Sequence, residues 1–347
     1  MAATKVLIVD DSITMRALFT SALERSRDIV VVGAADGADE ARELIAELRP
    51  NVITLDVEMP GMNGIDFLAE LMETNPIPVV MLSTLTQKGA DVSLRAIELG
   101  AVDCFPKPAR ATPDEFDKIS GKLCKTVLTA AKTNLAARKT PAARAAPVAV
   151  GDYVWRDEIV VVAGGMGSIE AATEMLTAFP ANCPPTIVSL AIDEGLGVPF
   201  ASRVSKAAGA KVKMATDGEA LEQGVLYIAV DPAFHVAVDR WPGGRLRFVN
   251  RDPVNGVRPS ADLLFASVAK TAAAKAIGVV LSGGGSDGAA GVAAIKAGGG
   301  TCMVQDPATA LVPAMIEAAI ARGVTAMAAP GQLAAQVCPS GSVSIAA

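Results

Sequence analysis

The sequence predicts an α/β protein with two domains, each built on a mainly parallel β-sheet. Length is the first reason, because 347 residues correspond to about two domains at ~150 residues per domain. The second is that short apolar runs alternate with amphipathic helical patterns, as in doubly wound α/β folds. The third is composition: 51% of the residues are hydrophobic but only 4% are aromatic, so the cores must consist mainly of aliphatic side chains and Met.

Residues 1–123 contain five short apolar runs separated by helical patterns. The expected strands are Val6–Val9, Ile29–Ala34, Val52–Leu55, Val79–Ser83 and Ala101–Pro106. The expected helices are Ile13–Arg25, Ala38–Leu48, Gly64–Glu73, Asp91–Leu99 and one that begins near Asp114. Continuously apolar strands separated by helices predict a parallel sheet that is covered on both faces.

Residues 124–156 are expected to connect the two domains. From Lys118 to Val150 the chain has no acidic residue and seven basic ones, which are Lys118, Lys122, Lys125, Lys132, Arg138, Lys139 and Arg144. A solvated, partly helical linker fits this composition, and so does a docking strip for an acidic partner. The linker is the favoured interpretation.

Residues 157–347 predict a second α/β domain with glycine-rich turns after its strands. The expected strands are Ile159–Ala163, Thr186–Ile192, Val225–Ala229, His235–Val238, Ile277–Ser282 and Thr301–Gln305. The expected helices are Glu170–Phe179, Phe200–Ala208, Ala261–Ala276, Val292–Lys296 and Pro313–Ala321. The alternation predicts a doubly wound, mainly parallel sheet.

Charge and composition argue against several classes of protein. The net charge of −6 argues against general nucleic-acid binding, and no apolar run approaches the ~20 residues that span a bilayer. The N-terminus lacks the pattern of a signal peptide, and the five cysteines show no CxxC spacing, so we expect reduced thiols in a cytoplasmic protein. The single histidine, His235, argues against a zinc site built from several imidazoles.

Five polar side chains follow the predicted strands of the first domain at their carboxyl ends. They are Asp10, Asp11, Asp56, Ser83 and Lys107. Functional side chains of open parallel sheets gather at this edge, so we expect these five to converge. Three carboxylates together favour a hard divalent cation such as Mg²⁺, and an aspartate in such a pocket can attack a phosphoryl group. The plainer interpretation, helix capping by strand-end aspartates, does not account for all five.

Residues 1–123 resemble the receiver domains of bacterial response regulators, on the segments VLIVDDS, ITLDVEMPGMNG, VVMLSTLT and FPKP. The resemblance implies a flavodoxin-like (βα)5 fold, a histidine kinase as phosphodonor, and Asp56 as the phospho-acceptor. It implies that Mg²⁺ is held by Asp10, Asp11, Asp56 and the Glu58 carbonyl.

The same resemblance implies that Ser83 is the switch hydroxyl and that Lys107 contacts the phosphoryl group. One position departs from the family pattern. An aromatic switch residue usually stands three positions before the lysine, and here that position is Cys104. An aromatic rotamer switch is therefore expected to be absent or altered.

Nearly the whole chain resembles the chemotaxis protein-glutamate methylesterases. The resemblance rests on the run from VVMLSTLT to FPKP and on YIA, RPSADLLF and VVLSGGGSDGAAG in the second domain. It implies a methylesterase fold, and chemoreceptor tails or other chemotaxis proteins as partners. That family hydrolyses methyl esters of receptor glutamates and deamidates receptor glutamines with a serine, a histidine and an aspartate.

Two of the three catalytic groups are missing at the matching positions. Gly165 stands where the family has its serine, Ala191 stands where it has its histidine, and only the aspartate remains, as Asp287. Ser168 and His235 could rescue the site only with large shifts. Since a triad acts as a unit, we expect an effector domain without catalysis. Without its histidine, Asp287 is expected to cap the helix that follows it.

The glycine-rich turns leave a nucleotide-binding interpretation open. Gly283, Gly285 and Gly288 satisfy GxGxxG after a strand, and Gly165 with Gly167 matches in part, with Asp193 at the end of the next strand. The third glycine of that second match is missing, because the position holds Glu170. Tight turns of an esterase fold explain the glycines more simply.

The sequence therefore predicts a phosphorylation-regulated chemotaxis response regulator whose effector domain acts by protein contact. The alternative is an active protein-glutamate methylesterase and protein-glutamine glutaminase with an unconventional site. The two hypotheses differ in whether methanol is released from a methylated receptor.

Overall fold

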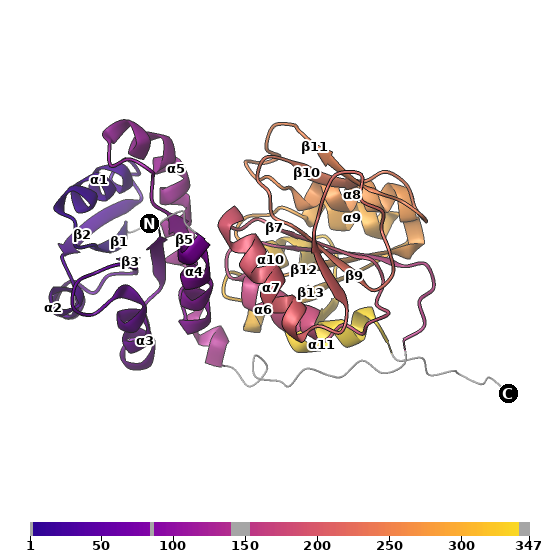
Figure 1. Ribbon diagram of the computed structural model, residues 1–347, viewed down its shortest axis with the longest axis horizontal. Coiled ribbons are helices and arrows are strands. Elements are labelled where there is room, and N and C mark those ends of the chain that lie inside the picture. The colour runs from indigo at the N-terminus through magenta and orange to yellow at the C-terminus, as the bar shows by residue number, and fades with distance from the viewer. Residues whose placement is uncertain (1–2, 84–86, 140–152, 340–347) are drawn as a thin grey trace. The chain divides into compact units, whose positions relative to one another are not determined.

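The computed structural model of the chain describes residues 3–83, 87–139 and 153–339. The chain divides into two compact units, Met1–Leu135 and Ala136–Ala347 (Figure 1). The division falls inside the predicted linker, of which residues 140–152, including Arg144 of the basic stretch, lie outside the described residues. In the described part of the chain, no helix is long and apolar enough to cross a membrane.

The N-terminal unit contains a five-stranded parallel sheet in the order β2-β1-β3-β4-β5. Its strands are β1 (Thr4–Val9), β2 (Ile29–Ala35), β3 (Val52–Asp56), β4 (Val79–Ser83) and β5 (Asp103–Pro106). Every residue of β3 and β4 is buried, which explains why both strands are mainly apolar, with polar residues only at Thr54 and at the last position of each strand. The flavodoxin-like parallel fold predicted from the sequence is confirmed.

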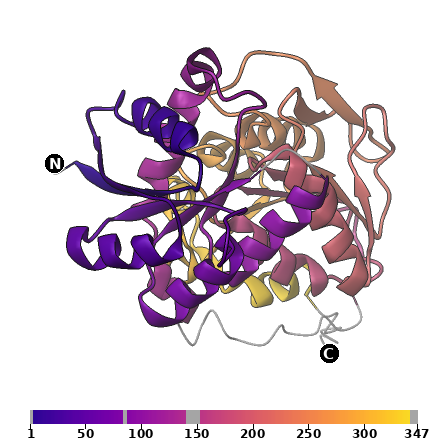
Figure 2. The ribbon, with the colours of Figure 1, turned by 60° about the vertical axis from the view of Figure 1, so that its left-hand side comes forward.

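Five helices cover both faces of this sheet (Figure 2). They are α1 (Ile13–Leu23), α2 (Ala38–Leu48), α3 (Gly64–Thr74), α4 (Gln87–Leu99) and α5 (Pro113–Ala130). α1 begins at Ser12, whose hydroxyl accepts a hydrogen bond from the Met15 amide. α1 packs against α5 through Phe19 and Phe116, whose ring centroids lie 4.8 Å apart, edge to face.

The C-terminal unit contains a seven-stranded parallel sheet in the order β14-β13-β12-β6-β7-β9-β8, and a separate antiparallel hairpin of β10 and β11. The strands of the sheet are β6 (Ile159–Gly164), β7 (Thr186–Leu190), β8 (Lys211–Met214), β9 (Val225–Ala229), β12 (Ala276–Val280), β13 (Thr301–Gln305) and β14 (Ala326–Ala328). The hairpin strands are β10 (His235–Val238) and β11 (Leu246–Val249). The doubly wound parallel fold is confirmed here as well.

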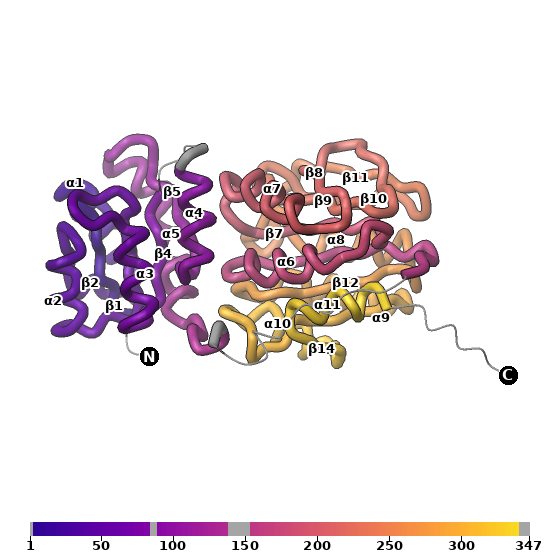
Figure 3. The backbone as a smooth tube through the Cα atoms, turned by 60° about the horizontal axis from the view of Figure 1, so that its bottom comes forward, coloured from indigo at the N-terminus to yellow at the C-terminus, as the bar shows by residue number. Residues whose placement is uncertain are grey.

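The helices of this unit pack closely on the sheet and on one another. They are α6 (Ser168–Thr177), α7 (Gly197–Ala207), α8 (Ala261–Ala272), α9 (Ala289–Ala297), α10 (Ala314–Ile320) and α11 (Pro330–Val337). α11 lies alongside α6 (Figure 3). α8 and α9 approach so closely that a Cβ on Gly291 would lie 2.4 Å from the Phe265 Cβ, so this position requires glycine.

Four elements of the C-terminal unit were not predicted from the sequence: β8, β11, β14 and α11. β8 is an edge strand with the sequence KVKM and no buried residue, and β14 has only three residues, so neither carries a clear period. α7 begins three residues earlier than expected, at Gly197. Pro199 is compatible with this first turn, because amides there have no partner within the helix and proline has no amide hydrogen.

Candidate functional site

The loops at the carboxyl ends of β1 and β3 bring three carboxylates of the N-terminal unit together. One oxygen each from Asp10, Asp11 and Asp56 lies within 4.8 Å of the others. Asp10 is fully buried and Asp56 nearly so, whereas Asp11 is exposed. The parallel topology produces this convergence, as the sequence predicted, because β1 and β3 are neighbours in the sheet.

Lys107 joins this cluster from the end of β5. Its Nζ lies 2.8 Å from Oδ2 of Asp10 and 2.8 Å from Oδ2 of Asp56. Burial opposes the charged ammonium, but the hydrogen bonds to the two carboxylates outweigh burial and raise the pKa of Lys107. Burial raises the pKa of Asp56 above its ordinary value, although the bond from Lys107 acts in the opposite direction.

This donor set fits a divalent cation. One ammonium faces three carboxylates, so the cluster keeps excess negative charge at short range. Carboxylate oxygens are the ligands that Mg²⁺ prefers, and the exposed Asp11 leaves the cluster open to solvent on one side. The residues present therefore suit the cation that the sequence predicted.

The remaining predicted residues of this site surround the cluster. Ser83 ends β4, is buried, and its carbonyl accepts a hydrogen bond from the Lys107 amide at 2.8 Å. The exposed Glu58 donates its amide to Oδ1 of Asp56 at 3.4 Å. Cys104 is buried under α4, where its thiol donates to the Ser93 carbonyl at 3.4 Å. A small buried thiol therefore occupies the place expected for an aromatic switch.

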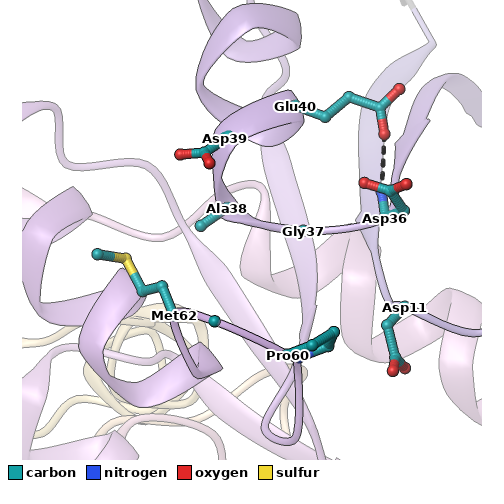
Figure 4. A pocket seen from close by; sticks show the side chains of 9 residues that line it. Asp11, Asp36, Gly37, Ala38, Asp39, Glu40, Pro60 and Met62 are labelled. Carbon is teal, nitrogen blue, oxygen red and sulfur yellow. Dashed lines mark hydrogen bonds between the residues drawn. The ribbon is translucent and has the colours of Figure 1, made fainter.

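Two features beside the cluster were not predicted from the sequence. An acidic cavity of about 400 Å³ opens next to Asp11 between the loops after β2 and β3 (Figure 4). Its acidic lining residues are Asp11, Asp36, Asp39 and Glu40. The other feature is Arg16, whose guanidinium Nη1 donates to the Asp10 and Asp11 carbonyls. The run DGADE after β2 was a signal for the first feature, but no motif pointed to Arg16.

The second candidate site lies at the carboxyl ends of β6 and β7 in the C-terminal unit. A Cβ on Gly165 would lie 3.8 Å from the Ala191 carbonyl oxygen and 3.6 Å from the Gly283 Cα. The positions matched to the nucleophile and the base are thus neighbours, and a Cβ at residue 165 would make only ordinary van der Waals contacts. Neither residue supplies a hydroxyl or an imidazole.

Ser168 and His235 are both held in other roles. The buried Ser168 hydroxyl, in the first turn of α6, donates to the Gly165 carbonyl at 2.7 Å. The buried His235 ring accepts the Ser260 amide on Nδ1 at 3.1 Å, which leaves Nε2 to donate to the Asp252 carbonyl at 3.1 Å. Both ring nitrogens of His235 therefore have hydrogen-bond partners, and no nucleophile–base pair forms among these groups.

Asp287 caps a helix, but not the one that follows it. Its carboxylate accepts hydrogen bonds from the Ser260 hydroxyl at 2.9 Å, the Ala261 amide at 2.7 Å and the Asp262 amide at 3.1 Å, at the N-terminus of α8. The expectation that it caps α9 is wrong. Asp262 caps α9 instead, by accepting the Gly291 amide at 2.8 Å. The close packing of α8 and α9 brings Asp287 to the N-terminus of α8 and Asp262 to the N-terminus of α9.

The glycine-rich turns pack against the protein's own side chains. A Cβ on Gly167 would lie 2.8 Å from the Leu311 Cβ, and one on Gly283 would lie 2.1 Å from the Met315 sulfur. Asp193 accepts the Gly195 amide and caps a single turn of helix. Packing thus explains Gly167 and Gly283 without a bound nucleotide, and Gly285 has a φ of +84°, which favours glycine.

Comparisons with known proteins cover both units. The chain matches the CheB methylesterase family over residues 160–337 and the response regulator receiver domain over residues 6–116. It is 45% identical to a Caulobacter vibrioides protein named protein-glutamate methylesterase/protein-glutamine glutaminase 1, over 93% of each chain. A Rhizobium etli protein named protein-glutamate methylesterase/protein-glutamine glutaminase is 42% identical over 90% of this chain and 89% of that protein.

A solved structure is similar to the C-terminal unit. It is the CheB methylesterase catalytic domain of Thermotoga maritima, with a TM-score of 0.50 and 27% identity, and the match covers 53% of this chain and 98% of that one.

Proposed function

The chain belongs to the CheB methylesterase family and is a chemotaxis response regulator with a receiver domain, and we propose that a histidine kinase phosphorylates it on Asp56. The observation that supports this assignment is the placement of Asp56 beside Asp10, Asp11 and Lys107. We further propose domain limits of 1–123 and 157–347, joined by the linker 124–156.

The site's own residues account for phosphoryl transfer. A carboxylate oxygen of Asp56 attacks the phosphorus of a phosphohistidine, a P–O bond forms, and the P–N bond breaks with the electron pair returning to the imidazole. The Lys107 ammonium, now within 2.8 Å of Asp56, contacts a phosphoryl oxygen and balances its charge. The Ser83 hydroxyl at the end of β4 donates to another phosphoryl oxygen and draws its loop inward.

Asp10, Asp11, Asp56 and the Glu58 carbonyl are the residues that would hold Mg²⁺. When bound, the cation neutralises charge on the phosphoryl oxygens. Its binding also relieves the repulsion among the three carboxylates, which Lys107 balances only in part.

Phosphotransfer from a chemotaxis histidine kinase tests the acceptor. The Asp56→Asn variant should take no label from radiolabelled kinase, because the amide cannot act as the nucleophile. Asp66→Asn is a matched control in the same unit, at an exposed position in the first turn of α3. Full labelling of Asp56→Asn would show that another residue is the acceptor.

We propose that the effector domain acts by protein contact without hydrolysis. Gly165 and Ala191 stand at the positions of the nucleophile and base, and Ser168, His235 and Asp287 are each engaged in structural hydrogen bonds. Its partners would be chemoreceptor tails or other chemotaxis proteins, reached when phosphorylation rearranges the receiver surface. A pull-down with and without beryllofluoride should show a partner whose capture depends on this phosphoryl mimic.

Hydrolysis is the second candidate function, and the comparisons favour it over a non-catalytic domain. The relatives at 39–45% identity over nearly the whole chain are named methylesterase/glutaminase, and the fold and Asp287 are retained. Methanol release from a methylated receptor separates the two functions. The non-catalytic proposal expects a rate on the order of 10⁶-fold below that of the Caulobacter vibrioides relative, as after loss of a nucleophile or base. Turnover that vanishes in Ser168→Ala would establish an unconventional esterase.

A further inference from the structure

Arg16 reaches back from the second turn of α1 to the loop that carries two of the clustered carboxylates. Its guanidinium Nη1 donates to the Asp10 carbonyl at 2.8 Å and to the Asp11 carbonyl at 3.1 Å. We propose that Arg16 is a positioning residue for the cation site, which fixes the backbone at residues 10 and 11 so that both carboxylates face Asp56. This inference rests on the proposed function of the same site.

The three carboxylates are held in place to different degrees. Asp10 is fixed from both sides, since its Oδ2 accepts from Lys107 at 2.8 Å and its Oδ1 accepts from the Ser12 amide at 3.0 Å. Asp56 accepts from Lys107 and from the Glu58 amide. Within the described part of the chain, no hydrogen bond holds the exposed Asp11 carboxylate. Its direction therefore depends on its own backbone.

The Arg16 guanidinium restrains that backbone where the carboxylates repel one another. Like charges within 4.8 Å drive the flexible Asp11 side chain towards solvent unless its peptide group is fixed. A charge-assisted hydrogen bond to each of two successive carbonyls fixes both peptide planes, and the guanidinium adds positive charge beside the cluster. Arg16 thereby lowers the free-energy cost of holding the three carboxylates together in the cation-free site.

A purely local role at the start of α1 is the competing explanation. The helix already has a cap, because the Ser12 hydroxyl accepts from the Met15 amide and the Ser12 carbonyl accepts from the Arg16 amide. The Arg16 side chain extends past this cap to residues 10 and 11. A local role predicts a change in stability alone, whereas a positioning role predicts a change in cation affinity.

The test is calorimetric titration of the full chain with MgCl₂, together with thermal unfolding in EDTA. Arg16→Met keeps the aliphatic stem but loses the donors and the charge, so its dissociation constant for Mg²⁺ should rise roughly 10-fold, the lower end of losses for residues that orient metal ligands. Arg16→Lys retains the charge and should recover part of the affinity. Arg25→Met is the matched control, since Arg25 pairs with Asp117 away from the cluster and should leave the affinity unchanged.

The phosphotransfer rate supplies a second readout. In Arg16→Met the Mg²⁺ concentration for half-maximal labelling should rise, while the rate at saturating Mg²⁺ stays near that of the wild type. The proposal would be overturned if Arg16→Met bound Mg²⁺ as tightly as the wild type does. It would also be overturned if Arg25→Met lost as much Mg²⁺ affinity as Arg16→Met. If Arg16→Met does not fold, Arg16→Lys decides: wild-type affinity for Mg²⁺ there would refute positioning by the guanidinium Nη1. Failure of the wild type itself to bind Mg²⁺ would instead refute the proposed function.

Discussion

Replacing Asp287 with alanine should destabilise the C-terminal unit, because this carboxylate closes the N-terminus of α8. The change leaves the amides of Ala261 and Asp262 without an acceptor in a region where Asp287 is only 6% exposed. Each buried amide left unpaired costs about 1–3 kcal/mol, and a lost helix cap costs about 1 kcal/mol when it is exposed. Removing the repulsion between Asp287 and Asp262 offsets part of this cost, so we expect the free energy of unfolding to fall by about 3 kcal/mol.

Unfolding in urea, followed by tryptophan fluorescence, measures this loss. Both tryptophans of the chain, Trp155 and Trp241, belong to the C-terminal unit, so the signal reports on that unit alone. Asp287→Asn should lose less stability than Asp287→Ala, because its carbonyl oxygen still accepts one amide. Asp193→Ala is the control, since it removes a half-buried carboxylate that caps only a single turn of helix and should cost less than about 1 kcal/mol.

Two results would refute the reasoning. Wild-type stability in Asp287→Ala would mean that the three hydrogen bonds contribute nothing net to folding. A variant as stable as the wild type that lost measurable methanol release would instead assign Asp287 to catalysis.

Two further predictions follow from the C-terminal unit. The double substitution Gly165→Ser and Ala191→His should release methanol from methylated receptor faster than the wild type and either single variant do. The reason is that a Cβ at residue 165 makes only ordinary contacts near residue 191. Equal rates in all four proteins would show that more than two side chains are missing. Burial raises the pKa of Glu174, so the folded state binds a proton more readily than the unfolded state, and stability falls as pH rises from the ordinary value of 4.5 through the raised value. Glu174→Gln should therefore have the higher melting temperature at pH 7, with the difference vanishing below pH 4.5; a lower melting temperature at pH 7 would contradict this sign.

The sequence predicted the parallel sheets because their central strands are fully buried. β6 is an unbroken apolar run and β3 is mainly apolar, since helices cover both faces of the sheets at these strands. The edge strand β8 was missed because its four residues mix lysines with apolar residues and none is buried, and β14 was missed because it has only three residues. Local pattern thus fails where tertiary pairing alone decides the structure.

The acidic cluster was predictable for a related reason. Asp10 and Asp56 follow neighbouring strands, and topology alone brings such positions together. Arg16 was not predictable, because its contacts depend on how a long side chain folds back over the turn before its own helix. The cap formed by Asp287 was assigned to the wrong helix, since the approach of α8 to α9 depends on the packing of Gly291 against Phe265.

The reciprocal capping of α8 and α9 also bears on how an enzyme of this family could lose its chemistry. Selection for hydrolysis alone would preserve residues at positions 165 and 191, and once that selection relaxes, mutations there carry little penalty for folding. Asp287 is different, because its carboxylate also accepts the amides of Ala261 and Asp262 at the N-terminus of α8, whether or not the domain is catalytic. Decay should therefore be ordered in evolutionary time, with the nucleophile and base lost first and the aspartate retained. An aspartate that persists at this position in a lineage therefore indicates common ancestry and a structural role. It does not by itself indicate that the protein still hydrolyses an ester.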